Sequence, residues 1–186
     1  ALEPIRQAYG LNQVVVSTYQ AVSGAGTHAI TELEQQSQTF GETKDTQATI
    51  LPVKSAEKHY PIAFNVIPQI DVFDDNGYTF EEMKMINETK KILHMPDLAV
   101  SATCVRLPVV SGHSESVFIQ IDKDDVTVDD LKKLLADSKG IQLQDNPAQQ
   151  EYPMPLYAEG EDPVFVGRIR KDLSNNKGFH LWIVAD

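Results

Sequence analysis

Residues 101–116, SATCVRLPVVSGHSES, set one arginine, Arg106, in an apolar, strand-like run and place His113 seven residues later, after a Ser-Gly pair. A guanidinium is a planar, permanently charged donor group that suits a carboxylate or a phosphate, and an imidazole titrates near neutral pH. The two residues are therefore candidates for an anion clamp and a proton shuttle on one strand-turn-strand unit. The pattern also fits a surface ion pair and a solvated turn histidine, and the spacing alone leaves both interpretations open.

Around this stretch, hydrophobic periodicity predicts an α+β domain. Predicted strands cover residues 13–22, 98–110, 116–121, 141–143, 164–169 and 179–184. Predicted helices cover residues 27–38, 79–93 and 127–136, and residues 1–10 have the pattern of a helix that ends at Gly10. This order favours a mixed or mostly antiparallel sheet with the helices packed on one face. The other face would be partly apolar, which suggests a subunit or domain interface.

The helix predicted over residues 79–93 carries the clearest local signals. Thr79 and Glu82 have the spacing of a capping box. Glu81 and Lys84 lie three positions apart and would be displayed as an acid and a cation side by side, although the spacing equally fits an ordinary helix ion pair. The residues predicted to share one apolar face are Phe80, Met83, Ile86 and Leu93.

A glycine-rich turn, residues 23–26 (SGAG), joins the first predicted strand to the helix over residues 27–38. Strand, glycine turn and helix resemble a phosphate cradle in outline, but neither dinucleotide-binding nor P-loop spacing is present, so a tight turn explains the glycines as well. Gln20 lies at the end of that strand, where functional side chains often project. Residues 41–58 are polar and predict a loop, and residues 59–70, with two prolines, predict an edge strand or an irregular packed segment.

Composition excludes several classes of function. The net charge of −11 argues against binding to nucleic acid or to an anionic membrane surface, and no apolar run is long enough to span a bilayer. Cys104 is the single cysteine, so an intramolecular disulfide and a Cys-rich zinc site are excluded and a reducing, cytoplasmic setting is favoured. Within its apolar run Cys104 is predicted to be a buried, inert thiol. His180, inside another apolar strand, is predicted to be a core or interface histidine.

Both ends of the chain look abrupt. Residues 1–10 resemble the tail of a helix, and the chain stops at Asp186 directly after an apolar strand. We therefore expect residues 1–186 to form a single domain excised from a longer protein.

Four blocks in order, STYQAVSGAG, FEEMK with ETKKIL, SATCVRLPVVSGHSES and VFVGRIRKD, resemble aspartate-β-semialdehyde dehydrogenases of the Gram-positive type. The resemblance covers nearly the whole chain, and it is to the second half of that family. It implies the fold of the C-terminal domain of glyceraldehyde-3-phosphate dehydrogenase and a homodimer. It also implies an NADP-dependent conversion of β-aspartyl phosphate to aspartate semialdehyde, on the route to lysine, threonine and methionine.

The resemblance assigns roles to residues already singled out. Arg106 would clamp the α-carboxylate of the substrate, and His113 would be the acid/base catalyst. Gln20 would orient the substrate or the acyl-enzyme. Glu81 would hold the substrate amino group, and Lys84 would help to bind phosphate.

The turn residues Ser23, Gly24 and Gly26 would lie beside the nicotinamide end of NADP, and no metal is implied. The family's catalytic cysteine, its nucleotide-binding domain and its final helix have no counterpart here, so we expect the isolated chain to be inactive. Two alternatives remain: a non-catalytic dimerisation module, and the substrate domain of a related acyl-phosphate reductase.

Overall fold

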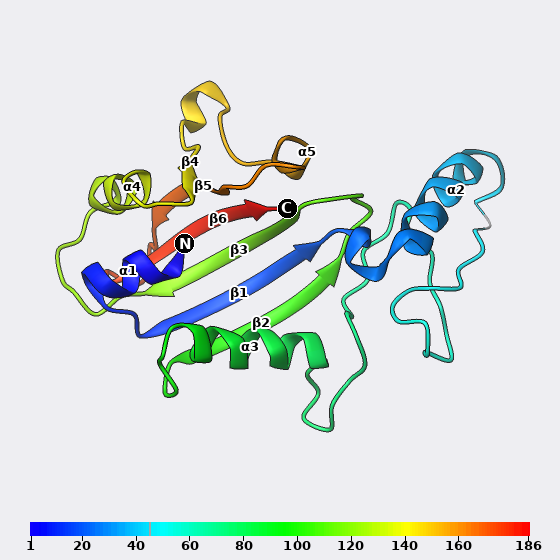
Figure 1. The fold of residues 1–186 in the computed structure, drawn as a ribbon, viewed down its shortest axis with the longest axis horizontal. Coiled ribbons are helices and arrows are strands. Elements are labelled where there is room, and N and C mark those ends of the chain that lie inside the picture. The colour runs from blue at the N-terminus through cyan, green and yellow to red at the C-terminus, as the bar shows by residue number, and fades with distance from the viewer. Residues whose placement is uncertain (45) are drawn as a thin grey trace.

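The computed structural model describes residues 1–44 and 46–186, and its centre is a six-stranded sheet in the order β2-β1-β3-β6-β5-β4 (Figure 1). The neighbours β1/β3, β3/β6 and β6/β5 are antiparallel, whereas β2/β1 and β4/β5 are parallel. The predicted mixed and mostly antiparallel sheet is confirmed. The strands are β1 Gln13–Gln20, β2 Ala99–Arg106, β3 His113–Gln120, β4 Ile141–Leu143, β5 Val164–Lys171 and β6 Gly178–Ala185.

Three helices cover one face of this sheet: α1 Leu2–Tyr9, α3 Phe80–Ile92 and α4 Val128–Ala136. Alternate strand residues such as Val14, Val117 and Leu181 meet Ile5 of α1 and Leu131 of α4 in one core. Full burial of an aliphatic side chain of this kind stabilises the fold by ~1.5–3 kcal/mol. The helix-covered face predicted from the sequence is therefore the main core of the domain.

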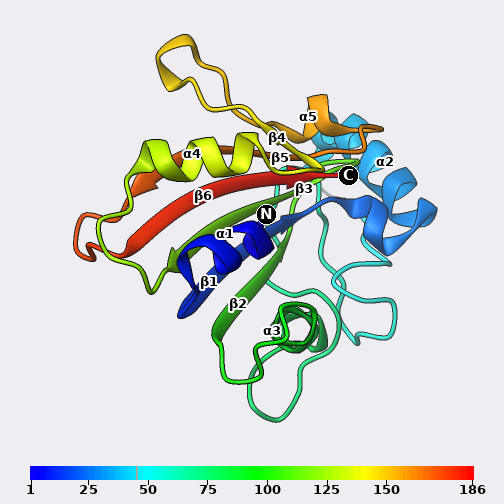
Figure 2. The ribbon, with the colours of Figure 1, turned by 60° about the vertical axis from the view of Figure 1, so that its left-hand side comes forward.

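Other elements lie away from that face. Helix α2 Thr27–Thr43 and the irregular chain after it lie beyond the ends of β1 and β2 (Figures 1 and 2). Helix α5 Pro155–Ala158 packs through Ala158 on Phe165 and Val184, which face away from the main core. The 3₁₀ helices are η1 Val22–Ala25 and η2 Pro147–Gln149.

Helix α3 confirms the predicted capping box but not the predicted buried face. Thr79 Oγ1 accepts the Glu82 N–H at 3.2 Å, and Glu82 Oε2 accepts the Thr79 N–H at 2.9 Å. Phe80 is half-exposed, whereas Glu82 is only 8% exposed. The predicted face is therefore wrong at its first residue. The reason is that α3 packs beside β2, an edge strand whose outward N–H groups need acceptors.

Several boundaries differ from those predicted. Strand β3 begins at His113 rather than residue 116, and β2 ends at Arg106 rather than residue 110. Helix α2 runs to Thr43, beyond the predicted end at residue 38. Of the predicted loop over residues 41–58, residue 45 lies outside the described residues. None of the helices in the part of the chain that the structure describes is both long and apolar enough to cross a membrane.

The chain between α2 and α3 is irregular, as one of the two predictions for residues 59–70 proposed. It is held to α2 by polar side chains: Gln36 Oε1 accepts the N–H groups of Ile62 and Ala63 at 2.9 and 3.0 Å. A single antiparallel bridge joins Ile67 to Arg106, with N···O distances of 3.1 and 2.9 Å. The excursion is thereby tied to the last residue of β2.

Candidate active site

The polar residues predicted from the sequence gather where β1 and β2 end and β3 begins. Gln20 and Arg106 are register partners at the ends of two parallel strands, so their side chains project from the same face. His113 opens β3, which runs antiparallel to β1, so it starts beside the end of β1. Sheet topology thus unites side chains that are far apart in sequence.

Arg106 is a buried cation with unused donors. Its residue exposure is 4%, and Nη1 donates to the Ala21 carbonyl at 2.5 Å. Its Nε is buried and has no hydrogen-bond partner among the described residues. Burial lowers the pKa of Arg106, and the negative charge of Glu81 opposes that shift. A guanidinium remains charged at neutral pH in any case, so the arrangement suits an incoming anion.

His113 is held as a neutral ring. The Ala21 N–H donates to Nδ1 at 3.1 Å, so the single proton of the neutral imidazole is on Nε2. Burial lowers the pKa of His113, and the nearby charge of Arg106 lowers it further, while Asp186 and Glu81 act in the opposite direction. The hydrogen bond from Ala21 also favours the neutral form. At neutral pH the residue can donate through Nε2 and is not a fixed cation.

Glu81 and Gln20 complete the polar group. Gln20 Nε2 donates to Thr18 Oγ1 at 3.2 Å and to Glu81 Oε1 at 3.4 Å. Lys84 Nζ lies 3.6 Å from Glu81 Oε2, with its side chain 58% exposed. Glu81 and Lys84 therefore form a helix ion pair, and Glu81 also accepts a hydrogen bond from Gln20. The functional interpretation of the pair stays a prediction.

The predicted glycine turn is the 3₁₀ helix η1, and it lies against the same residues. A Cβ added to Gly24 would be 3.2 Å from Arg106 Nη1 and 3.8 Å from His113 Cε1. Ser23 N donates to the Val110 carbonyl at 3.1 Å, which fastens the turn to the loop before β3. Gly26 has φ +91°, a conformation that favours glycine, and serves as the N-cap of α2.

A cavity of about 430 Å³ opens on this group and includes Gly24, Glu81 and Arg106 in its lining. The irregular segment after α2 supplies another wall, from Ile50 to Lys54, and α2 supplies His28. Sequence reasoning missed His28 and Lys54, because nothing in a polar loop or at a helix start indicates which distant strand end it will meet.

Two further ionisable groups lie near the site on the core face. Glu115 is the residue after next from His113 on β3 and shares its face; burial raises its pKa, and the Ala1 amino group opposes that shift. The alternation of residues along the strand could have indicated that Glu115 lies on the same face as His113. Cys104 is fully buried, and burial raises the pKa of its thiol to about 11. The predicted inert thiol agrees with this, since a thiolate would be disfavoured.

His180 lies on the other face of the sheet, apart from the site. Its Nε2 is 2.7 Å from Asp172 Oδ2, and its ring is 5.3 Å from that of Phe118. Tyr19 and Trp182 form a second ring pair on this face, at 5.6 Å. These aromatic residues are partly exposed, and no helix of the main core covers them.

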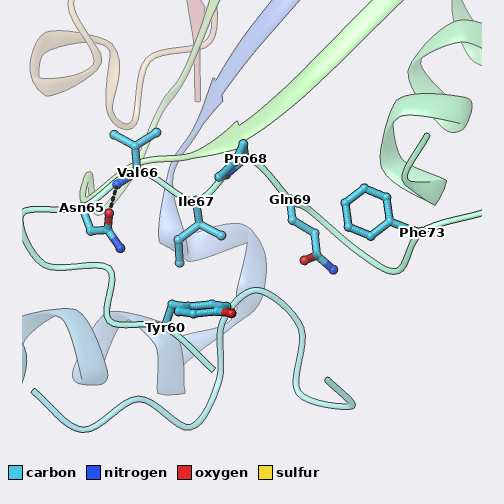
Figure 3. A pocket seen from close by; sticks show the side chains of 7 residues that line it. All are labelled: Tyr60, Asn65, Val66, Ile67, Pro68, Gln69 and Phe73. Carbon is cyan, nitrogen blue, oxygen red and sulfur yellow. Dashed lines mark hydrogen bonds between the residues drawn. The ribbon is translucent and has the colours of Figure 1, made fainter. Parts of the chain in front are cut away.

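A second cavity, of about 350 Å³, lies in the excursion after α2 (Figure 3). Its lining is mostly apolar, and its polar members are one phenol, Tyr60, and two amides, Asn65 and Gln69. The other residues of the lining are Val66, Ile67, Pro68 and Phe73. It contains no carboxylate, imidazole or cation among the described lining residues, so it offers no acid, base or anion clamp. Of these two cavities, the one beside Arg106 carries the acidic and basic side chains.

That arrangement can bind an anion and hold a cationic group within one cavity, with a group that can move a proton beside it. Arg106 supplies donors, Glu81 supplies a carboxylate and His113 supplies a neutral imidazole. Across residues 1–44 and 46–186, no group of three or more His, Cys, Asp or Glu side chains is arranged to hold a metal ion. The site suits an organic substrate that carries both a negatively charged group, for Arg106, and a positively charged group, for Glu81.

Comparison with known proteins gives a match over almost the whole chain. Residues 2–186 match the family described as semialdehyde dehydrogenase, dimerisation domain. The chain is 66% identical to the aspartate-semialdehyde dehydrogenase of Bacillus subtilis over 186 residues, which are 100% of this chain and 54% of that protein. It is 48% identical to the enzyme of the same name from Aquifex aeolicus, covering 100% of this chain and 53% of the relative.

A similar solved structure is aspartate semialdehyde dehydrogenase II from Vibrio cholerae complexed with ASA. It is 41% identical, with a TM-score of 0.87, and the match covers 100% of this chain and 52% of that one. The chain therefore spans about half the length of the curated relatives it matches.

Proposed function

The chain belongs to the family of semialdehyde dehydrogenase dimerisation domains, and from that membership we propose that it is the substrate-binding and dimerisation half of an NADP-dependent aspartate-semialdehyde dehydrogenase. The complete enzyme would interconvert β-aspartyl phosphate and aspartate semialdehyde. The observation that carries the proposal is the meeting of Arg106 and Glu81 in one cavity, with His113 and Gln20 beside them.

The charges of the cavity match an amino-acid substrate. Arg106 binds the α-carboxylate through its guanidinium, whose Nε has no hydrogen-bond partner among the described residues, and Glu81 binds the α-ammonium group. Lys84 lies on the exposed side of Glu81 and contributes a positive charge for phosphate. A substrate without an amino group would leave the Glu81 carboxylate without that partner, which distinguishes this activity from that of a related acyl-phosphate reductase.

His113 is the acid/base catalyst of the proposal. In the neutral ring the proton on Nε2 can stabilise negative charge on the carbonyl oxygen under attack. Taking up a second proton requires Nδ1, so the contact with the Ala21 N–H must open first. Gln20, anchored by Thr18 and Glu81, orients the reacting group beside it.

The residues present fit the nicotinamide end of NADP at the η1 turn. Gly24 lines the cavity beside Arg106, and among the described residues no neighbour lies within 4 Å of where a Cβ of Gly26 would be, so the backbone is accessible along the turn. Ser23, Gly24 and Gly26 would hold that end of the cofactor. When bound, NADP would supply the hydride transfer.

The attacking thiolate and the remainder of the NADP site would come from the half of the enzyme that the chain does not match in its relatives. Cys104 does not replace that thiolate, because it is buried and its pKa is raised to about 11. The 186-residue chain alone is therefore expected to be inactive.

The family description also favours a second function, dimerisation. The surface for it is the face of the sheet opposite the main core, where Tyr19 pairs with Trp182 and Phe118 with His180. Aromatic residues are enriched in protein interfaces, and a second copy of the chain would cover them. Sedimentation of the chain should give a dimer, and Trp182→Glu should give a monomer.

The enzymatic proposal is tested by NADPH formation from aspartate semialdehyde and phosphate. The full-length enzyme should turn over aspartate semialdehyde, should depend on phosphate, and should use succinate semialdehyde, which lacks the amino group, poorly. The 186-residue chain should show no turnover. A full-length enzyme that prefers succinate semialdehyde would instead support the acyl-phosphate reductase alternative. Turnover by the isolated chain would contradict the requirement for an external thiolate.

A further inference from the structure

Glu82 is a buried carboxylate that the proposed reaction does not use. It occupies the first turn of α3, next to Glu81, and is 8% exposed. Burial of a carboxylate is costly unless hydrogen bonds compensate for the lost water. The hydrogen bonds that Glu82 makes therefore show which parts of the structure it connects.

Each oxygen of Glu82 accepts a backbone N–H from a different element. Oε2 accepts from Thr79 at 2.9 Å, which closes the capping box at the start of α3. Oε1 accepts from Cys104 at 2.9 Å, and Cys104 belongs to β2. A capping box needs only the first of these bonds, so the second is an additional link from the helix to the sheet.

The link joins the two elements that carry the opposite charges of the cavity. Glu81 is the residue before Glu82, and Arg106 is two residues after Cys104 on the same strand face. The outward N–H groups of Cys104 and Arg106 are both satisfied at the edge of β2, the first by Glu82 and the second by the Ile67 carbonyl at 2.9 Å. Movement of α3 along β2 would break the bond to Cys104 and change the separation of Glu81 and Arg106.

We propose that Glu82 is a positioning residue that fixes the spacing between Glu81 and Arg106, and so determines that the site accepts a substrate with an ammonium and a carboxylate group on one carbon. The inference rests on the proposed function of Glu81 and Arg106. Glu82 itself touches backbone amides and acts through its neighbour.

The test is Glu82→Gln in the full-length enzyme, with kcat and KM measured for aspartate semialdehyde and for succinate semialdehyde. An amide has one acceptor oxygen, so the oxygen can satisfy only one of the two backbone N–H groups while the NH₂ group faces the other. We expect the preference for aspartate semialdehyde to fall about tenfold, mainly through KM, which is the usual consequence of losing one hydrogen bond to a charged group. The KM values for NADP should stay unchanged, because Glu82 lies on the substrate side.

The matched control is Glu88→Gln, the same chemical change at an exposed position of the same helix, which should keep the wild-type preference. Glu82→Asp retains a carboxylate but shortens its reach, and it should lower the preference as well. This variant carries the test if Glu82→Gln fails to fold.

Three results are distinguishable. A reduced preference in the Glu82 variants, with Glu88→Gln unaffected, supports the inference. An unchanged preference, or equal losses for both substrates, overturns it and leaves the proposed function standing. A wild-type enzyme that does not discriminate between the two substrates contradicts the role of Glu81 itself, and the inference falls with it.

Discussion

At one edge of the sheet Glu82 accepts the N–H groups of Thr79 and Cys104, and towards the opposite edge Asp145 accepts those of Arg168 and Ile169 at 2.9 and 3.0 Å. Both carboxylates are almost fully buried, with the Asp145 side chain 1% exposed. Both connect segments that do not pair as regular strands. The same chemical device therefore occurs twice, once beside each edge strand.

The two carboxylates differ in what they hold. Asp145 follows β4 and stabilises the irregularity in β5, where Arg168 has φ +52°, and Lys132 pairs with it at 3.1 Å. Glu82 holds the start of α3 against β2, next to residues of the polar cavity. A buried carboxylate that binds backbone amides is thus a structural feature by itself. It gains a functional consequence only when the elements it joins carry the reacting groups.

The largest effect should come from His113, which lies at the start of β3 beside the polar cavity. His113→Asn in the full-length enzyme should lower kcat at least ~10²-fold, the usual scale for an acid/base catalyst. The asparagine oxygen can still accept the Ala21 N–H, so folding should be preserved. His94→Asn, at an exposed position after α3, is the matched control and should retain wild-type kcat. Normal turnover of His113→Asn would remove the catalytic assignment.

Towards the opposite edge of the sheet, Asp145→Asn should destabilise the domain by about 2–3 kcal/mol, because one of the two backbone donors and Lys132 lose an acceptor with a buried side chain. Urea unfolding measures this loss. Substrate KM values for the full-length variant should not change. Asp124→Asn, which removes an ion pair whose carboxylate is 70% exposed, should cost less than ~1 kcal/mol. A specific increase in substrate KM for Asp145→Asn would show that Asp145 also affects the site, and would contradict the difference proposed between Asp145 and Glu82.

Arg106→Lys tests whether Arg106, at the end of β2, binds the carboxylate of the substrate. A lysine ammonium replaces the guanidinium fork with a point charge, so we expect KM for aspartate semialdehyde to rise about tenfold with a smaller change in kcat. Steady-state kinetics of the full-length enzyme separate the two constants. An unchanged KM would show that the substrate carboxylate binds elsewhere.

The titration of His113 tests its surroundings directly. Burial and Arg106 lower its pKa, so NMR of the full-length enzyme should show a midpoint below the ordinary value of 6.5. Since the folded pKa is depressed, the unfolded chain binds more protons just below pH 6.5, and this group makes the fold less stable as pH falls through that window. Arg106→Gln should raise the midpoint, by removing the positive charge. A midpoint above 6.5 in the wild type would contradict the buried, neutral ring.

Much of the fold follows from local signals. The capping box at Thr79 and the alternation of the strands predicted most elements correctly, because each depends on residues close in sequence. The burial of Glu82 could not be predicted in this way, since it depends on which strand lies at the sheet edge. The resemblance pointed to candidate site residues on the strands and on α3. It did not point to His28, which lies at the start of α2, or to Lys54, which lies in an irregular segment without periodicity.

The smallest expected effect tests how closely the η1 turn packs on Arg106. In Gly24→Ala the new Cβ would be 3.2 Å from Arg106 Nη1, so the guanidinium must shift by a few tenths of an ångström. Because Nη1 also donates to Ala21, the shift should raise KM for aspartate semialdehyde about two- to fivefold and leave stability nearly unchanged. Gly41→Ala, at a helical position where no described neighbour would lie within 4 Å of the new Cβ, should stabilise the fold by ~0.5–1 kcal/mol without any kinetic change. If Gly24→Ala instead lowered stability and left KM unchanged, the η1 turn would have a structural role like that of Asp145. It would then not contribute to substrate binding beside Arg106.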